Sequence, residues 1–381
     1  MESSNYSKVN LILFLILSSF LPSCNQADNE EEILNYLDVL KEQYVPDTRV
    51  GIFDYEIHEG VLFGQTDQKE VLNAVTKYLS AQNSYLIDSL ELLPSKSLGA
   101  DTLAVINVSV ANIRSQPGHS QELSTQALLG TPVKVLFKKG GWYKVQTPDG
   151  YLGYIENGVL EFNPKEYNSS EKVIYASSFG FVYSRPTLNS PTVSDLSLGG
   201  LLGKISMAAD YTGVVLPDGR KGYVPSRELM SLAEFLKASE HTNIAQLTSR
   251  FLGIPYLWGG TSFKGADCSG FTRTVFLNKG IYLPRDASQQ AAAGIRIEPG
   301  AEFENLLEGD LLFFGPSESK VTHVAVYLGG QRFIHSSGMV RYGSFNRNSP
   351  EFDEFNLNRF LFAKRVLGQQ NVKYLNANTL Y

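Results

Sequence analysis

The chain has 381 residues, a formal net charge of −6 at pH 7, 43% hydrophobic residues and 12% aromatic residues. This length suffices for two to four domains, and the hydrophobic content indicates a globular rather than a disordered protein. The negative charge argues against a nucleic-acid partner, because binding to phosphates requires a surplus of Lys and Arg. Cysteine and histidine chemistry is restricted to two cysteines and five histidines.

The first 24 residues have the pattern of a bacterial lipoprotein signal peptide. Lys8 precedes the apolar run 9–17, which is too short to span a bilayer but suits the core of a signal peptide. The segment Leu21-Pro-Ser-Cys24 then resembles a lipoprotein cleavage box, in which Cys24 receives the lipid. An ordinary secretory signal peptide is the alternative. We therefore expect an exported bacterial lipoprotein of the cell envelope, facing the periplasm or on the outer membrane, with its lipid anchor as the only membrane contact.

Residues 25–103 are predicted to form a small α/β unit. Apolar residues at helical spacing from Ile33 to Leu40 predict one helix, and residues 68–79 predict a second. Between them, residues 47–58 have the composition of a strand. This unit carries no recognisable chemical motif, so its role is left open.

An internal repeat follows the N-terminal unit. Short β runs broken by Asp-Gly turns predict two small barrels, over residues 104–165 and 170–232. The segment starting at Asn112 aligns with the segment starting at Phe181, and Pro148-Asp-Gly aligns with Pro217-Asp-Gly, without gaps. Both barrels resemble bacterial SH3 (SH3b) domains, the first more closely than the second.

The stretch 256–271 carries the motif around which the rest of the chain is interpreted. It begins as an aromatic, glycine-rich loop and ends at Cys268, after which Phe271, Val275 and Phe276 recur at helical spacing. Cys268 is therefore expected at a helix N-terminus, where unpaired N–H groups and the helix dipole favour the thiolate. A buried structural cysteine is the alternative interpretation.

A nucleophilic cysteine needs a base, and the base needs an orienting partner. His323 lies in the β-rich run 321–328, and His335 lies in the next predicted strand, 332–337. Gly329-Gly330 between them is a hairpin signal, so the two histidines are expected on neighbouring strands.

These motifs, in this order, resemble the NlpC/P60 cysteine peptidases. The match extends from about residue 238 to 367 and includes Tyr-x-Trp-Gly-Gly, Asp-Cys-Ser-Gly-Phe, Thr-His-Val-Ala-Val-Tyr and Phe-Ile-His-Ser. The resemblance implies a nucleophile, Cys268, a general base, His323, and an orienting residue, His335, without metal or cofactor. The expected fold is multidomain α+β, with a papain-like catalytic domain over 238–367 preceded by two SH3b barrels and the small α/β unit, and with a tail over 368–381.

The resemblance also implies substrate-binding residues. In YkfC-like members of the family an SH3b domain closes one end of the cleft, and an acidic residue and a tyrosine bind the free amino group of L-Ala. The candidates are Glu122 with Tyr151 or Tyr154; alternatively Glu122 is solvated and both tyrosines belong to the barrel core. The further candidates in the catalytic domain are Tyr256, Trp258, Asp267, Ser269, Asp286 and Ser288.

Several of these assignments have a structural alternative. Asp267 is expected either to bind substrate or to cap the helix that follows, and Asp286 to bind substrate, to cap its helix, or to do both. Trp258 is either a flat wall of the cleft or part of the core. At the position after Asp286, either Ala287 or Ser288 takes the substrate-binding role. Tyr256 and the backbone N–H of Cys268 are expected to hold the oxyanion.

The implied activity is a γ-D-glutamyl-L-diamino acid endopeptidase acting on peptidoglycan-derived peptides. If the barrel caps the site, the substrates carry a free N-terminal L-Ala and the role is cell-wall turnover or recycling. Without the cap, the enzyme is a hydrolase of intact wall. Two other classes are considered. A catalytically inactive wall-binding lipoprotein is disfavoured by the intact set of Cys268, His323 and His335. An acyltransferase of the lecithin-retinol type is disfavoured by the barrels. Diaminopimelate or lysine preference is left open.

Overall fold

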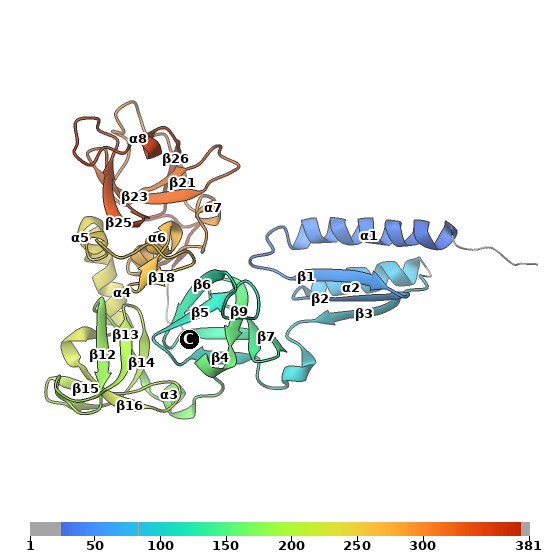
Figure 1. Cartoon of the computed structure of the whole chain (residues 1–381), viewed down its shortest axis with the longest axis horizontal. Coiled ribbons are helices and arrows are strands. Elements are labelled where there is room, and N and C mark those ends of the chain that lie inside the picture. Colours follow the sequence, from blue (N-terminus) through green and yellow to red (C-terminus); the bar gives the residue numbers. More distant parts are fainter. Residues whose placement is uncertain (1–23, 83, 375–381) are drawn as a thin grey trace, which may run out of the picture.

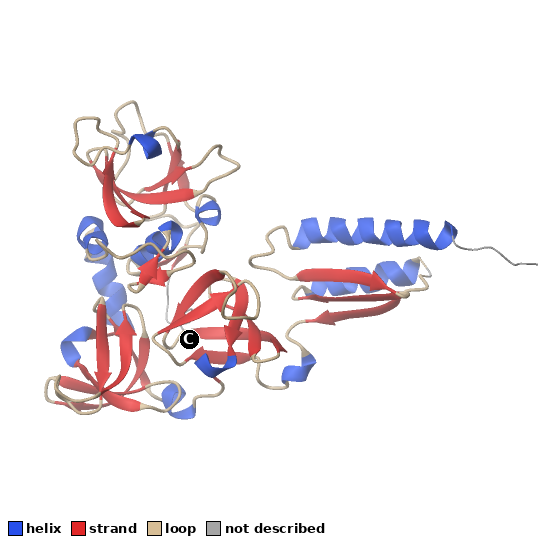
Figure 2. Cartoon of the chain, in the orientation of Figure 1, coloured by secondary structure: helices blue, strands red, loops and turns tan. Residues whose placement is uncertain are grey.

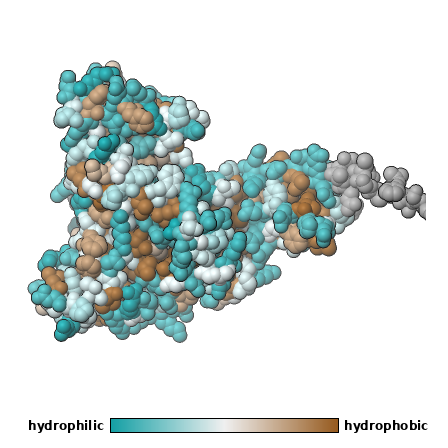
Figure 3. Space-filling model, viewed as in Figure 1, coloured by the Kyte–Doolittle hydropathy of each residue, from teal (hydrophilic) through white to brown (hydrophobic). Residues whose placement is uncertain are grey.

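The structure is a computed structural model that describes residues 24–82 and 84–374. Figure 1 shows an N-terminal unit that projects to one side of two barrels and a C-terminal domain. Of the predicted signal peptide only Cys24, where helix α1 begins, falls within this range, so the signal peptide and the lipidation stay predictions. No described helix is long and apolar enough to cross a bilayer. The face viewed in Figure 3 is mostly hydrophilic.

The N-terminal unit packs two helices against a three-stranded sheet of order β1-β2-β3. β1 and β2 form an antiparallel hairpin, and β3 runs parallel to β2 after a crossover through α2. Apolar residues recur every four positions, as at Val71, Val75 and Leu79, so that one face of each helix is buried in a shared core. The elements are α1 (Cys24–Tyr44), β1 (Phe53–His58), β2 (Val61–Thr66), α2 (Lys69–Ala81) and β3 (Ile87–Leu92).

The strand predicted over 47–58 is correct only from Phe53 onward. Residues 47–50 form a turn, in which the Asp47 carboxylate accepts the backbone N–H of Arg49 at 3.0 Å and the Asp47 carbonyl accepts that of Val50 at 3.1 Å. Such local hydrogen bonds compete with strand pairing. The turn is held against the first barrel, where the Leu152 N–H donates to the Arg49 carbonyl at 2.8 Å.

The first barrel is a seven-stranded sheet of order β10-β4-β7-β8-β9-β5-β6. Its core is made of side chains that alternate with exposed ones along each strand, such as Ile113, Val135 and Val145. Figure 2 shows that strands dominate this region, with only short helical turns between them. The strands are β4 (Leu103–Ile106), β5 (Val110–Arg114), β6 (Leu123–Leu128), β7 (Pro132–Lys139), β8 (Trp142–Gln146), β9 (Leu152–Glu156) and β10 (Leu160–Glu161).

The second barrel repeats the first strand for strand. Its sheet order, β13-β12-β16-β15-β14-β11-β17, matches that of the first barrel read from β6 to β10. A short helix, α3 (Lys165–Ser169), joins the two barrels, and five strands of each have the same lengths. The strands are β11 (Glu171–Tyr175), β12 (Phe179–Tyr183), β13 (Thr192–Ser197), β14 (Leu201–Ala208), β15 (Tyr211–Val215), β16 (Lys221–Pro225) and β17 (Leu229–Ser231).

The C-terminal domain is built on an antiparallel sheet of order β21-β26-β22-β23-β24-β25. Helix α6 covers one face, where Phe271 and Val275 pack against Val324 and Val326. The elements are α4 (Leu232–His241), α5 (Ile244–Ser249), β18 (Thr261–Ser262), β19 (Gly265–Ala266), α6 (Cys268–Leu277), β20 (Ile281–Tyr282), α7 (Ala287–Gln290), β21 (Ile295–Ile297), β22 (Leu311–Phe314), β23 (His323–Gly329), β24 (Arg332–Ser337), β25 (Met339–Ser344), α8 (Glu354–Leu357), β26 (Phe360–Arg365) and β27 (Lys373–Tyr374).

The expected loose tail over 368–381 is partly ordered. β27 pairs with β20 in a two-stranded sheet, and the Lys373 ammonium donates to the carbonyl of Pro148 in the first barrel at 3.0 Å. These contacts hold residues 373–374 beside the first barrel, and residues 375–381 lie outside the described part of the chain.

Candidate active site

The cysteine lies where the sequence predicts it, at the first residue of α6. Asp267 is the N-cap of this helix and accepts the backbone N–H of Gly270 at 2.7 Å. The Cys268 side chain is 7% exposed and receives hydrogen bonds from the backbone N–H groups of Ser269 and Val324. Because Val324 follows His323 in β23, the thiol lies against the start of the strand that carries the predicted base.

The two histidines lie on adjacent antiparallel strands and contact each other. His323 Nε2 is 2.9 Å from His335 Nδ1, and His335 Nε2 is 3.9 Å from a carboxylate oxygen of Asp353. With its Nε2 proton facing this carboxylate, His335 presents an unprotonated Nδ1 that accepts the Nε2 proton of His323. This arrangement leaves His323 Nδ1 free to act as the base.

Burial of Cys268 opposes the thiolate that its place at the helix start favours. Burial, followed by the negative charge of Asp267, raises the pKa of Cys268 to about 12, and the two backbone N–H groups only partly offset this. Burial, followed by the charge of a protonated His335, lowers the pKa of His323 to about 3. Desolvation therefore acts against the helix start on the thiol and against the charged form of His323.

A buried ion pair between Arg285 and Asp267 supports the helix start that carries the nucleophile. Arg285, whose side chain is 1% exposed, donates to both carboxylate oxygens of Asp267, at 3.1 and 2.5 Å. It also donates to the hydroxyl of Ser269 at 3.0 Å and to that of Thr125, in β6 of the first barrel, at 3.1 Å. The same guanidinium thus links the N-cap of α6 to the barrel.

The first barrel closes against the loop that precedes the cysteine. Gln126 of β6 is 6% exposed and accepts the N–H of Thr261 at 3.0 Å and the hydroxyl of Ser262 at 3.1 Å. Gly259 has a φ of 77°, and an added Cβ would lie 2.2 Å from the carbonyl oxygen of Leu123. Only glycine allows this close approach, which explains the Trp-Gly-Gly sequence of the loop.

A cleft of about 620 Å³ runs from the cysteine to the first barrel and the N-terminal unit. Its lining includes eight of the nine predicted substrate-binding residues; these are Glu122, Tyr151, Tyr256, Trp258, Asp267, Ser269, Asp286 and Ser288. The exception is Tyr154, whose ring packs against Phe137 and under the Lys144 ammonium instead. Tyr154 lies within β9, whereas Tyr151 precedes that strand and directs its hydroxyl to Asp286.

Two carboxylates lie at the barrel end of this cleft. Glu122 accepts the indole N–H of Trp258 on Oε1 at 2.7 Å. Asp286 accepts the hydroxyl of Tyr151 at 3.1 Å and the guanidinium of Arg49 at 2.9 Å, both on Oδ2. The Asp286 side chain also takes part in a capping box with Gln289 at the start of α7, so it caps that helix as well as lining the cleft. Among the described residues, Glu122 Oε2 has no hydrogen-bond partner and is free to accept from a ligand.

The remaining predicted substrate-binding residues differ in how many of their side-chain polar atoms already have hydrogen-bond partners. All oxygens of Asp267 are engaged by backbone N–H groups, Ser269 and Arg285, so the structure gives this residue the capping role. Ala287 and Ser288 both line the cleft, but only Ser288 has a polar side chain, which accepts a hydrogen bond from Arg49 at 3.0 Å. Tyr256 has no side-chain hydrogen-bond partner in the described part of the chain, and burial raises its pKa to about 12, so it remains a donor.

Sequence reasoning missed three residues of the site. Arg49 comes from the N-terminal unit, forms two hydrogen bonds with Asp47 at 2.7 and 2.8 Å, and reaches across the cleft to Asp286. Arg285 and Asp353 support the nucleophile and the histidine pair. The charged residue before Asp286 was a usable signal for Arg285, whereas no local pattern marks Arg49 or Asp353.

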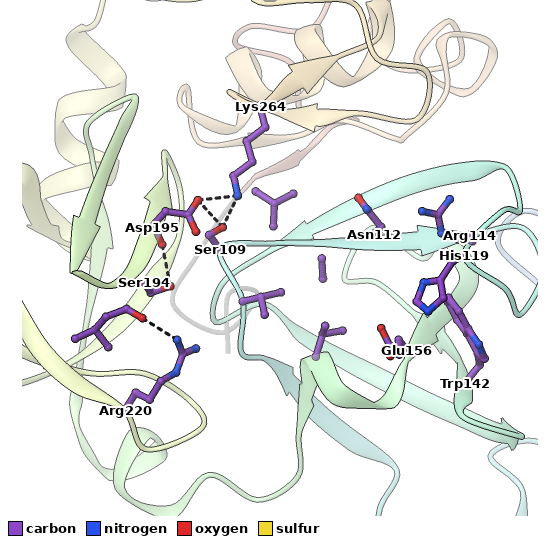
Figure 4. Close-up of a pocket in the computed structure, with 15 residues that line it drawn as sticks. Ser109, Asn112, Arg114, His119, Trp142, Glu156, Ser194, Asp195, Arg220 and Lys264 are labelled. Carbon is purple, nitrogen blue, oxygen red and sulfur yellow. Dashed lines mark hydrogen bonds and ion pairs between the residues drawn. The ribbon is translucent and has the colours of Figure 1, made fainter. Parts of the chain in front are cut away.

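A second cavity, of about 530 Å³, lies between the barrels and is separate from the cleft. Figure 4 shows Lys264 of the C-terminal domain reaching Asp195 in the second barrel and Ser109 in the first, at 2.6 and 2.7 Å. His119 stacks edge-on against Trp142 here, with ring centroids 5.1 Å apart. This cluster joins the two barrels to the C-terminal domain.

Comparison with known proteins agrees with this geometry. The profile of the NlpC/P60 family matches residues 253–353, and that of the bacterial SH3 domain matches residues 109–161. The gamma-D-glutamyl-L-lysine dipeptidyl-peptidase of Bacillus cereus is 32% identical over 57% of this chain and 68% of its own length, and that of Bacillus subtilis is 33% identical over 56% and 72%. A crystal structure of an NlpC/P60 family protein from Bacillus cereus superposes with a TM-score of 0.60 at 27% identity, covering 70% of this chain and 99% of that one.

Proposed function

Because the chain belongs to the NlpC/P60 family and is a cysteine peptidase related to peptidoglycan hydrolases, we propose that it cleaves stem peptides with a free N-terminal L-Ala. The bond hydrolysed is the amide between γ-D-Glu and the diamino acid. The observation that carries the proposal is the pair of carboxylates, Glu122 and Asp286, at the barrel end of the cleft, of which Glu122 has one oxygen without a partner among the described residues.

An ammonium group fits that end of the cleft better than an acylated amine. A buried ammonium requires a paired carboxylate as a hydrogen-bond acceptor, which Glu122 Oε2 supplies beside the carboxylate of Asp286. The barrel and the turn 47–50 stand where a glycan-linked substituent would continue, since Thr48, Arg49 and Tyr151 line the same end. A stem peptide that is still attached to peptidoglycan through its amino group lacks the ammonium charge. Its glycan-linked substituent would also collide with the barrel and the turn 47–50.

The chemistry follows from the arrangement of Cys268, His323 and His335. As the sulfur attacks the γ-carbonyl carbon, His323 Nδ1 takes the thiol proton, and its Nε2 proton remains bonded to His335. The Cys268 N–H, which has no partner within the helix, and the Tyr256 hydroxyl stabilise the oxyanion. His323 then protonates the leaving amine, and a water activated by the same nitrogen hydrolyses the thioester, releasing L-Ala-γ-D-Glu.

The cellular setting is part of the same proposal. Lipidation at Cys24 would tether the enzyme to a membrane of the cell envelope, where peptides released during wall turnover are accessible. The second barrel, whose strand order repeats that of the first, is proposed to be a second SH3b domain. A hydrolase of intact wall is the alternative function, and it requires that an acylated amino end be accepted.

Mass spectrometry of the products from L-Ala-γ-D-Glu-diaminopimelate and from its N-acetyl derivative tests the substrate. We expect cleavage of the free peptide to exceed that of the acetylated peptide by about 100-fold in kcat/KM, the magnitude of one or two charge-assisted hydrogen bonds. Glu122→Gln, which keeps an acceptor for Trp258, should reduce this preference. Equal cleavage of both peptides by the wild-type enzyme would reject the proposal, and Cys268→Ala controls for contaminating activity.

A further inference from the structure

A small cavity, distinct from the one between the barrels, adjoins the cleft on the side of the base. It has a volume of about 290 Å³ and is lined by His323, while Tyr256 and Thr322 line both it and the larger cleft. The nucleophile lies in the larger cleft and the base in the smaller one. A substrate bound across both therefore extends over Cys268 and His323.

The direction of the substrate follows from the proposed function, on which this inference rests. With the ammonium of L-Ala at Glu122 and Asp286, the acyl part of the peptide lies in the larger cleft. The leaving amine must approach His323, because this residue protonates it. The smaller cavity is consequently the place of the diamino acid on the leaving side of the scissile bond.

Arg359 gives this cavity a cation without an acidic partner. Its Nη2 donates to the hydroxyl of Thr322 at 2.6 Å, and its guanidinium stacks on the exposed ring of Phe355, 4.6 Å from the centroid. Of the described residues, no Asp or Glu lies within ion-pairing distance of it, and most of its five N–H donors remain available. Guanidinium groups recognise carboxylates through paired hydrogen bonds.

We propose that Arg359 binds the α-carboxylate of the diamino acid that follows the scissile bond. Thr322 immediately precedes His323, so the hydrogen bond from Arg359 to Thr322 holds the guanidinium beside the base. The α-carboxylate is separated from the leaving nitrogen by a single carbon, whereas the distal end of the diamino acid side chain is several bonds farther away. The proximity of Arg359 to His323 therefore selects the α-carboxylate.

This assignment has a consequence for substrate length. A tripeptide ends in the diamino acid and presents a free α-carboxylate, but in a longer stem peptide the same carbon belongs to an amide. Arg359 thus makes the enzyme prefer peptides that are free at both ends. The exposed ring of Phe355 offers an apolar surface to the methylene groups of the diamino acid. Lysine and diaminopimelate both carry such methylene groups, so this contact does not distinguish them.

The test compares L-Ala-γ-D-Glu-L-Lys with its C-terminal amide, since lysine has no distal carboxylate. The wild-type enzyme is expected to cleave the acid about 10-fold better than the amide in kcat/KM, mainly through KM, as for a single charge-assisted contact. Arg359→Gln should bring this ratio close to one by slowing cleavage of the acid alone. Arg359→Lys, which keeps the charge without the planar fork, should retain part of the preference.

Arg341 provides a matched control. Like Arg359, its charge lowers the pKa of His323, but it lies on β25 and does not line the smaller cavity. Arg341→Gln should therefore leave the acid-to-amide ratio unchanged. A ratio that Arg359→Gln does not alter, or that Arg341→Gln alters equally, would overturn the inference, provided that thermal unfolding shows folded variants.

Two further outcomes separate this inference from the proposed function. If the wild-type enzyme cleaves N-acetylated and free peptides equally while Arg359→Gln still abolishes the acid preference, the proposed function fails and the role of Arg359 stands. If Arg359→Gln instead abolishes a preference for diaminopimelate amides over lysine amides, Arg359 binds the distal carboxylate and the α-carboxylate assignment is wrong.

Discussion

Replacing Arg285 with methionine tests the buried ion pair that supports the nucleophile. The side chains of Arg285 and Asp267 are 1% and 9% exposed, so the substitution leaves a largely buried carboxylate without its ion-pair partner. Removing one partner of a buried pair costs about 3–5 kcal/mol. Asp267 keeps three other hydrogen-bond donors, from Gly259, Ser269 and Gly270, which places the expected loss of unfolding free energy near the lower limit, at about 3 kcal/mol.

Urea unfolding followed by tryptophan fluorescence measures this loss. The chain has two tryptophans. A Trp142→Phe background leaves Trp258, in the loop before the nucleophile, as the reporter. With a slope of about 1–3 kcal/mol per molar urea, a loss of 3 kcal/mol shifts the midpoint by about 1–3 M. The control is Arg227→Met, whose side chain is 76% exposed and whose change should stay within about 0.5 kcal/mol.

A second substitution decides whether the unpaired charge is the cause. Adding Asp267→Asn to Arg285→Met removes the buried charge and should recover a measurable part of the lost stability. A single-variant loss below about 1 kcal/mol, or a double variant no more stable than Arg285→Met alone, would show that the ion pair does not carry the energy assigned to it.

Three other perturbations have expected outcomes. Burial lowers the pKa of His323 to about 3 and that of His335 to about 4, so the unfolded chain binds more protons below pH 6.5. Measured by urea titration, the unfolding free energy should fall between pH 6.5 and 5 by up to about 1.4 kcal/mol per pH unit for each histidine. This fall should be smaller in His335→Asn. Asp353→Asn should lower kcat about 3-fold in steady-state assays, because it weakens the orientation of His335. Arg49→Ala should raise KM for the free tripeptide about 10-fold with little change in kcat, because Asp286 loses its clamp; an equal fall in kcat would contradict this.

Local patterns predicted the parts of the site that depend on neighbouring residues. The position of Cys268 at the start of α6 follows from the apolar spacing after it, and the pairing of His323 with His335 follows from a two-strand pattern around Gly329-Gly330. The matching strands of the two barrels follow from the repeat. Each of these features is set by residues within a few positions of one another along the chain or by direct self-comparison.

The choice between Tyr151 and Tyr154 and the surroundings of the thiol depend on contacts that local patterns do not show. Tyr151 lies just before β9 and Tyr154 lies within it, and only the packing of this segment against distant residues decides which of the two side chains lines the cleft. For Cys268, the helix start was visible in the sequence, but the burial that raises the pKa comes from elements distant in the chain.

The sequence alone determined the chemistry of this protein, because the nucleophile, the base and the orienting residue each sit in a short motif whose local structure is set by its own residues. Only the tertiary structure decided the shape and charge of the cleft. Arg49, Glu122 and Asp286 are far apart in the chain and belong to three different parts of the fold, which long-range packing brings to one end of the cleft. Such packing depends on the summed burial of whole surfaces, and no single segment encodes it.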